Sequence, residues 1–214
     1  MSAPEKIRNT FIFSLRRLDP SKGVDLTIEA LASIKDDFPD LYLVIAGEGP
    51  EENYLKELVE KKSLSDRVLF LGTVPLSRGI SLLKGATLTV VPSRSEGGGL
   101  INIEAQAAGC PVIASRVGGI PEYVSDGESG ILFESGNAKE LAEKIKEILT
   151  DRRLRGKLIK GGFKHAERFS WDILAPRYMA LYKDAIVGHN KNIAFTPWSN
   201  LTAALWERLN HRLS

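Results

Sequence analysis

The stretch 93–109, with the sequence SRSEGGGLINIEAQAAG, contains the residues whose types and spacing are best suited to chemistry. Glu96 precedes three consecutive glycines, and Glu104 follows it by eight positions on a predicted helix that begins at Leu100. The first N–H groups of a helix lack intrahelical partners and carry partial positive charge, and glycines let a ligand approach them. The stretch therefore predicts an anion site suited to phosphate, with an ordinary loop-to-helix junction as the alternative.

Glu104 is predicted to face inward from this helix. Helical periodicity places it on one face with four apolar residues, at positions 100, 103, 107 and 108. A buried carboxylate is costly without donors, and two neighbouring sugar hydroxyls could supply them. The alternative is a carboxylate that only favours the start of a helix.

Basic residues follow the first predicted strand, in the segment SLRRLDPSKG at 14–23. Arginine binds phosphate through two parallel hydrogen bonds and lysine binds it as a point charge. Arg16, Arg17 and Lys22 could therefore complement the glycine stretch from the opposite wall of a cleft. The alternative is a solvated basic loop.

Several other kinds of site are not supported by the sequence. It contains no G-x-x-x-x-G-K-[ST] motif for a nucleoside triphosphate and no G-x-S-x-G motif for a nucleophilic serine. The segment GEGP at 47–50 is not a dinucleotide fingerprint. The three histidines, His165, His189 and His211, are isolated, so we expect neither a metal site nor a cofactor.

Short apolar runs alternate with helical patterns along the chain and must position these residues. The runs predict strands at 10–14, 41–47, 67–72, 87–93, 111–115 and 130–133. Helices are predicted at 24–38, 50–64, 77–86, 100–109, 137–151, 152–169 and 170–186. Apolar strands separated by helices indicate an α/β fold, a single Rossmann-like doubly wound parallel sheet of about six strands followed by C-terminal helices. Glycine-bearing loops follow four of the strands, so a binding edge is expected where their carboxyl ends meet.

Composition indicates an ordinary globular protein. The chain has 214 residues, of which 43% are hydrophobic, and a formal net charge of +2, which gives no reason to expect nucleic acid. The single cysteine, Cys110, reads as a packed apolar residue and fits a reducing, cytoplasmic location. We expect a short leading segment at 1–9, a domain at 10–188 and an extension at 189–214.

The extension differs from the domain. A polar break at 189–192 precedes a predicted helix with Thr196 as its N-cap. A stripe of Trp198, Leu201, Leu205 and Leu209 recurs at helical spacing along it. This stripe could pack on the same domain, on a partner domain or chain, or on a membrane surface.

Five segments, taken together and in order, resemble one half of a known enzyme architecture. They are RRLDPSKG, LVIAGEGP, VLFLGTV, PSRSEGGGLINIEAQAAGCPVIAS and VGGIPEYVSDGESGILF. The set is similar to the nucleotide-sugar-binding C-terminal domain of GT-B-fold retaining glycosyltransferases, the group with glycogen synthases, sucrose synthases and many bacterial polysaccharide glycosyltransferases. The resemblance covers about residues 10 to 185. It implies that residues 10–188 form the nucleotide-sugar-binding domain and that residues 1–9 are a linker remnant.

The resemblance implies a role for each matched residue. Glu96 lies near the donor sugar, Glu104 binds the ribose hydroxyls, and Arg17 and Lys22 contact the donor diphosphate. The remaining matches are backbone donors to sugar and phosphate (Gly98, Gly99 and Leu100), residues lining the nucleotide cleft (Gly47 and Gly49) and residues whose backbone meets the base (Thr73 and Val74). The implied activity is metal-independent sugar transfer with retention from a UDP-, GDP- or ADP-sugar, as in polysaccharide biosynthesis, with Glu96, Arg17 and Lys22 as catalytic residues.

Three departures from the family accompany the resemblance. Arg16 stands where glycine is common, and Gly98 stands where a bulky apolar residue is common. The acceptor-binding N-terminal domain does not fit before residue 10, so the isolated chain is expected to turn over little and to need that domain or a partner chain. Peripheral membrane contact of the full enzyme is a further expectation. A non-catalytic nucleotide-binding subunit and a GT-B-fold epimerase are the alternatives.

Overall fold

The computed structural model describes residues 10–192, with side chains placed to residue 186. Two compact units divide the chain, Met1–Phe169 and Ser170–Ser214, and each is described by itself. This division lies before the boundary at residue 188 that the sequence predicts. The predicted linker remnant at 1–9 lies outside the described residues.

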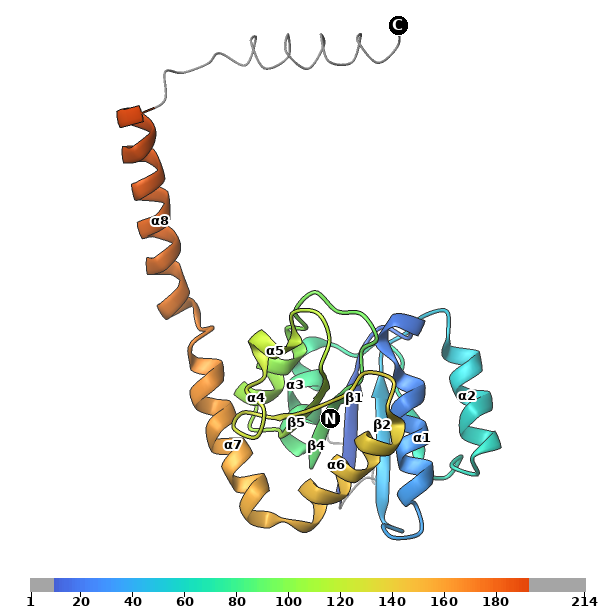
Figure 1. Ribbon diagram of the computed structural model, residues 1–214. Coiled ribbons are helices and arrows are strands. Elements are labelled where there is room, and N and C mark those ends of the chain that lie inside the picture. The colour runs from blue at the N-terminus through green and yellow to red at the C-terminus, as the bar shows by residue number, and fades with distance from the viewer. Residues whose placement is uncertain (1–9, 193–214) are drawn as a thin grey trace, which may run out of the picture. The chain divides into compact units, whose positions relative to one another are not determined.

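The first unit contains a six-stranded parallel sheet (Figure 1). Its strands are β1 (Thr10–Leu15), β2 (Leu41–Ala46), β3 (Val68–Phe70), β4 (Leu88–Val91), β5 (Val112–Ser115) and β6 (Ile131–Phe133). They are ordered β3-β2-β1-β4-β5-β6, and every adjacent pair is parallel. The predicted doubly wound α/β sheet with about six strands is confirmed.

Helices connect the strands. They are α1 (Val24–Ile34), α2 (Glu52–Lys61), α3 (Leu76–Gly85), α4 (Ile101–Ala107), α5 (Ile120–Tyr123), α6 (Ala138–Thr150) and α7 (Arg152–Glu167), with a 3-10 turn η1 at Pro20–Lys22. The sequence predicts every one of these except α5 and η1. Those two are too short to show a helical period.

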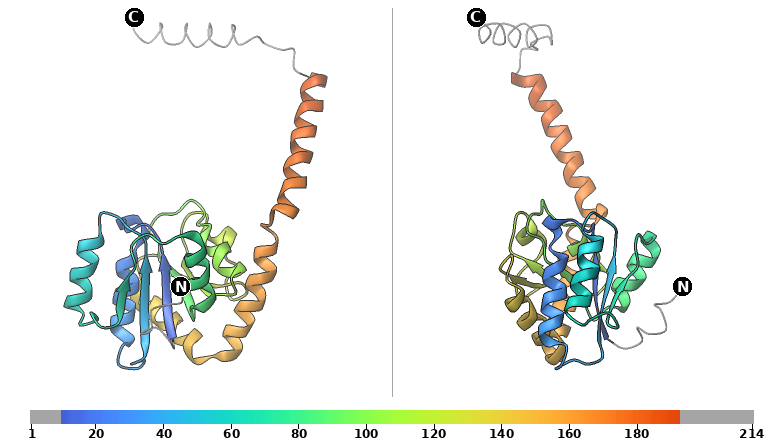
Figure 2. Two further views of the ribbon diagram at one scale, coloured as in Figure 1. Left: turned by 180° about the vertical axis from the view of Figure 1, so that it is seen from behind. Right: turned by 90° about the vertical axis from the view of Figure 1, so that its right-hand side faces the viewer.

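Helices lie on both faces of the sheet (Figure 2), and a layer of buried apolar side chains packs against each face. On β1, Ile12 packs toward α1, α2 and α6, while Phe11 and Phe13 pack toward α3, α4 and α5. Both faces of the strands are therefore buried, which explains why their sequences are apolar throughout rather than alternating.

The strand order reverses beside β1, because β2 lies on one side of it and β4 on the other. Ligands of open α/β sheets bind beyond the carboxyl ends of the strands at such a reversal. The segments that follow β1 and β4 contain the basic residues and the glycines singled out in the sequence. The fold thus brings the two predicted walls of the cleft to one place.

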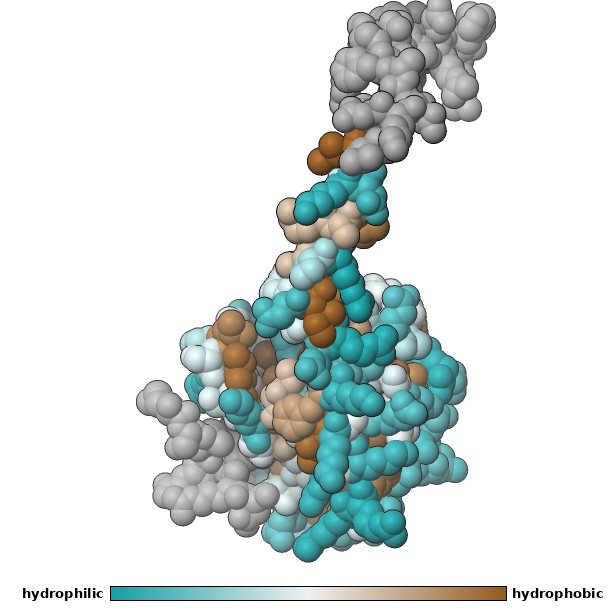
Figure 3. Space-filling view, turned by 90° about the vertical axis from the view of Figure 1, so that its left-hand side faces the viewer, coloured by the Kyte–Doolittle hydropathy of each residue, from teal (hydrophilic) through white to brown (hydrophobic). Residues whose placement is uncertain are grey.

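The second unit contains the helix α8 (Trp171–Asn192), which includes Pro176. The predicted break at 189–192 is wrong, because α8 continues through these residues. Large apolar side chains along α8, each at least half exposed, are Trp171, Tyr178, Met179, Leu181, Tyr182 and Ile186. Figure 3 shows brown, hydrophobic residues on the surface of this helix. The stripe predicted at 198–209 lies outside the described residues.

No helix within residues 10–192 is long and apolar enough to cross a membrane.

Candidate functional site

The glycine loop, residues 97–99, follows β4 and leads into α4. Its three glycines have different physical settings. Gly99 has a φ of 74°, a left-handed conformation that favours glycine. A Cβ at Gly98 would lie 2.7 Å from the ring of Tyr123, whereas a Cβ at Gly97 would meet nothing within 4 Å. Gly97 is therefore the one position of the loop whose surroundings leave room for a side chain.

An ion cluster joins the two walls of the site. Glu96 Oε2 accepts hydrogen bonds from Arg16 Nη2 at 2.8 Å and from Lys22 Nζ at 3.0 Å. Ser93 Oγ accepts from Arg16 Nη2 at 2.6 Å and donates to Glu96 Oε2 at 3.1 Å. The cluster lies at the carboxyl ends of β1 and β4, where the strand order reverses. Two cations and one anion thus face each other at the predicted binding edge.

Burial and charge act on both ends of this cluster. Burial lowers the pKa of the Arg16 guanidinium, while the charge and hydrogen bond of Glu96 oppose that shift. Burial alone would raise the pKa of the Glu96 carboxyl, but the hydrogen bond and charge of Lys22 and the charge of Arg16 outweigh it. The pKa of Glu96 therefore lies below its ordinary value, and the carboxylate is ionised at neutral pH.

The arginine next to Glu96 is Arg16 and not Arg17. The side chain of Arg16 is only 4% exposed, because it turns inward from the end of β1 toward Glu96. Arg17 is exposed and forms no ion pair with the described side chains. Adjacent residues in an extended segment point in opposite directions, so only one of the two can reach the cluster. The structure brings Lys22 to Glu96 as a close neighbour, but it does not bring Arg17 there.

The predicted inward orientation of Glu104 is wrong, because this residue is exposed on α4. The buried residues of the helix are Asn102, Ala105 and Gln106. The prediction assumed that the apolar residues of the helix form its buried face. Two of the buried residues are instead polar, and their side-chain amides form hydrogen bonds to backbone carbonyls. Asn102 Nδ2 donates to Gly99 O at 2.9 Å, and Gln106 Nε2 donates to Tyr123 O at 2.8 Å.

Leu100 immediately precedes α4, which begins at Ile101, one residue later than predicted. Its side chain is 69% exposed. The glycine loop and Leu100 therefore form an open rim at this edge of the sheet, next to the exposed Glu104.

Gly47 and Gly49 follow β2 and lie against the segment after β1. Arg16 N donates to Ala46 O at 2.9 Å, and Leu18 N donates to Glu48 O at 3.0 Å. A Cβ at Gly47 would lie 1.7 Å from Arg16 O, and one at Gly49 would lie 2.2 Å from Leu18 O. These glycines allow the two loops to touch, a structural role that the sequence analysis did not foresee.

Thr73 and Val74 follow β3 at the same edge of the sheet. Thr73 is exposed, and its backbone N–H donates to Glu48 Oε1 at 3.2 Å. Val74 is half-buried against the apolar layer of α3. The loop after β3 is therefore tied to the loop after β2, which contains Glu48.

The segment between β4 and the glycine loop is fixed by a set of contacts, here called the Arg94 clamp, that the sequence did not predict. Arg94 forms two parallel hydrogen bonds with Asp25, at 2.7 and 2.6 Å. The N–H groups of Arg94 and Ser95 also donate to Ser21 O, at 2.7 and 3.2 Å. This clamp holds Glu96 and Lys22 in their mutual positions. Arg94 and Asp25 lie far apart in the sequence, and nothing in their local pattern connects them.

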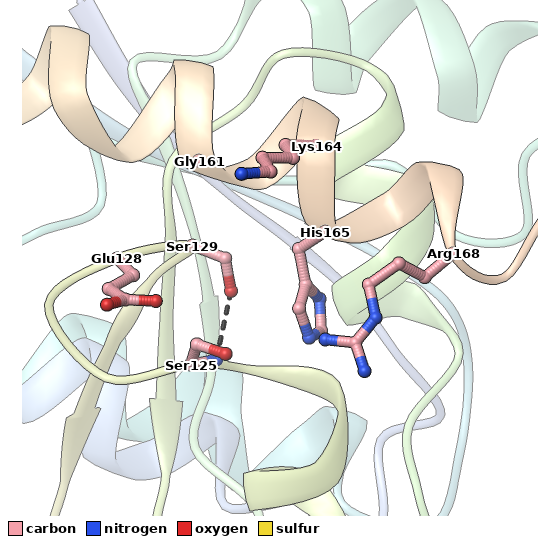
Figure 4. A pocket seen from close by; sticks show the side chains of 7 residues that line it. All are labelled: Ser125, Glu128, Ser129, Gly161, Lys164, His165 and Arg168. Atoms are coloured by element: carbon pink, nitrogen blue, oxygen red, sulfur yellow. Dashed lines mark hydrogen bonds between the residues drawn. The ribbon is translucent and has the colours of Figure 1, made fainter.

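A separate pocket of about 250 Å³ lies between the segment 125–129 and α7 (Figure 4). It contains none of the predicted site residues. His165 lines it and is mostly buried, and its Nδ1 lies 2.9 Å from Gln106 Oε1. Burial and the charge of Arg168 lower the pKa of His165, which favours the neutral ring.

Cys110 is buried, and burial raises the pKa of its thiol to about 12. It is a packed residue, as the sequence predicts, because reactivity requires the thiolate.

Comparisons with known proteins agree with this fold. Residues 3–165 match the family described as Glycosyl transferases group 1. A D-inositol 3-phosphate glycosyltransferase from Acidothermus cellulolyticus is 38% identical over 180 residues, covering 79% of this chain and 40% of that protein. A sucrose-phosphate synthase from Thermosynechococcus elongatus has a TM-score of 0.75 at 30% identity, covering 85% of this chain and 47% of the other. Anabaena HepE in complex with UDP and glucose has a TM-score of 0.73 at 26% identity, covering 86% of this chain and 53% of the other.

The chain therefore belongs to the group 1 glycosyltransferases and has the fold of the C-terminal domain of a GT-B architecture. It spans about 40% of the length of the curated relative and about half of the two solved chains.

Proposed function

We propose that this chain is the donor-binding half of a retaining glycosyltransferase that takes a sugar from a nucleoside diphosphate sugar. The observation that carries the proposal is the Arg16–Glu96–Lys22 cluster at the reversal of strand order, in a chain of this family. The description of Anabaena HepE as a complex with UDP and glucose supports this ligand class.

The residues divide the binding task by their chemistry. Negative charge grows on the departing nucleoside diphosphate during transfer, and Lys22 and the exposed Arg17 are the cations that would stabilise it. Glu96 would contact the donor sugar from the ion cluster. The exposed carboxylate of Glu104 is accessible to the ribose hydroxyls, and Gly98, Gly99 and Leu100 would offer backbone N–H groups to sugar and phosphate. These cations would allow transfer without a metal ion.

The acceptor would be bound by a domain outside this chain. The large apolar side chains of α8 that are at least half exposed fall largely on one side of the helix, and such a stripe favours a packing partner. We infer that an acceptor-binding domain covers this stripe in the complete enzyme. The same inference explains why the isolated chain is expected to bind a donor but to turn over little.

Calorimetry of the chain with UDP, GDP and ADP tests the proposed function. We expect one of the three to bind, with a Kd between micromolar and millimolar, about −8 to −4 kcal/mol. No binding by any of them up to millimolar concentration, in a folded sample, would contradict the proposal.

Glu104→Ala tests the ribose assignment. It should weaken the binding of the preferred nucleoside diphosphate about tenfold and leave binding of inorganic diphosphate within about twofold, because only the former contains ribose hydroxyls. Lys22→Ala is the matched comparison and should weaken both ligands. An equal loss for both ligands in Glu104→Ala would remove the ribose role.

A further inference from the structure

Gly98 is glycine for a steric reason. Its φ is not positive, so its backbone conformation is open to other residues. A Cβ at this position would lie 2.7 Å from Cε2, 3.0 Å from Cζ and 3.1 Å from Oη of Tyr123. The first distance is shorter than real Cβ contacts, and the other two are tighter than most of them. The ring of Tyr123, at the end of α5, therefore occupies the space that a side chain at position 98 would fill.

Tyr123 is held firmly in that place. Its ring stacks on Phe169, with centroids 5.3 Å apart and an interplanar angle of 21°. Its carbonyl oxygen accepts from Gln106 Nε2 at 2.8 Å, and Gln106 Oε1 in turn lies 2.9 Å from His165 Nδ1. Figure 4 shows His165 projecting from α7 next to Arg168. The stacked ring and this chain of hydrogen bonds tie Tyr123 to both α4 and α7.

The turn before α5 also touches the backbone of the glycine loop. A Cβ at Gly118 would lie 1.9 Å from Glu96 O, and a Cβ at Gly119 would lie 2.0 Å from Gly97 O. Gly119 N also donates a long hydrogen bond of 3.4 Å to Glu96 O. Gly118, Gly119 and Tyr123 therefore all pack against residues 96–98, and the ring of Tyr123 is the bulkiest of these contacts.

We propose that Tyr123 is the positioning residue of the glycine loop and that Gly98 and Tyr123 form a size-complementary pair. Three consecutive glycines leave a chain with wide conformational freedom, which must be restricted before the loop can bind a donor. The ring of Tyr123 supplies this restriction from a neighbouring element, because residues 97–99 have no side chains of their own. The inference rests on the proposed function, since the loop is positioned for a nucleoside diphosphate sugar.

A set of four variants of the full chain tests the pair. Tyr123→Ala removes the support and should speed amide hydrogen exchange of Asn102 and Gly119, whose N–H groups donate to Gly99 O and Glu96 O. It should also weaken UDP binding, and each change should be about tenfold, or ~1.4 kcal/mol. Tyr123→Phe keeps the ring and should bind UDP within about twofold of the unmodified chain. Gly98→Leu alone should clash with the ring and weaken UDP binding. Gly98→Leu with Tyr123→Ala should recover most of the lost affinity, the non-additivity expected of residues in contact.

The readouts separate this inference from the proposed function. Hydrogen exchange is measured without ligand, so unchanged exchange of Asn102 and Gly119 in a folded Tyr123→Ala chain overturns the positioning role whatever the chain binds. A double variant no better than the worse single variant overturns the size complementarity. If the unmodified chain binds no UDP, GDP or ADP while Tyr123→Ala loosens the loop, the proposed function is overturned and the packing pair is supported.

Discussion

Glu96→Ala is expected to lower the free energy of unfolding by about 3 kcal/mol, because it leaves a buried guanidinium without its anion. Arg16 is 4% exposed in its side chain, and Glu96 is its only ionic partner among the described residues. Its Nε and Nη1 atoms already have no hydrogen-bond partner in the described structure, so Glu96→Ala would leave Ser93 Oγ as the one side-chain acceptor described for this guanidinium. Urea denaturation measures the change. The same variant should bind the donor at least about tenfold more weakly, since the cluster would no longer hold Lys22.

Glu52→Ala is the matched control for this variant. Glu52 forms an ion pair of 2.7 Å with Lys56, but both side chains are more than a third exposed. Exposed pairs contribute about 0–1 kcal/mol, so the control should lose little stability. If Glu96→Ala were no more costly than Glu52→Ala, the cluster would have no special role in holding the site together.

The cluster also predicts how stability depends on pH. The pKa of Glu96 is lower in the folded chain than its ordinary value, so the ionised carboxylate favours the folded state. This contribution is present above the unfolded pKa of about 4.3 and is lost as the pH falls through the folded value. Urea midpoints for the unmodified chain and for Glu96→Gln should therefore differ most near pH 7 and converge as the pH falls below the unfolded value. A difference that grows as the pH falls would contradict the assignment.

The fold could be predicted from the sequence because the strands are buried on both faces. An apolar run such as LYLVIA at Leu41–Ala46 has few structures open to it besides a central strand. The binding edge follows from the same reasoning, since the carboxyl ends of parallel strands must meet. Very short elements such as α5, at Ile120–Tyr123, could not be predicted, because four residues do not show a helical period.

The candidate site was predicted less well, for two physical reasons. A polar residue can be buried when it bonds to a backbone carbonyl, as Asn102 and Gln106 do, and a count of apolar residues then misplaces the helix face. The choice between Arg16 and Arg17 depends on which way the chain leaves β1, which local sequence does not determine. The family resemblance directed attention to Arg17, while the unusual arginine at position 16 was the available sign of a buried partner for Glu96.

Gly47→Ala is expected to destabilise the chain by at least about 3 kcal/mol, through backbone strain and overpacking together. Gly47 has a φ of 129°, which side chains rarely permit, and a Cβ there would lie 1.7 Å from Arg16 O and 2.7 Å from Arg16 C. These are backbone atoms, so the clash can be relieved only by separating the loop after β2 from the segment that places Arg16.

Gly156→Ala is the control, because a Cβ on this residue of α7 would meet nothing within 4 Å. It should stabilise the chain by about 0.5–1 kcal/mol, so the same glycine-to-alanine change should destabilise the chain at position 47 and stabilise it at position 156.

Gly47→Ala displaces Arg16, the partner of Glu96. The double variant of Gly47→Ala and Glu96→Ala should therefore lose less stability than the sum of the two single losses. Additive losses in urea denaturation would show that the loop after β2 does not support the ion cluster.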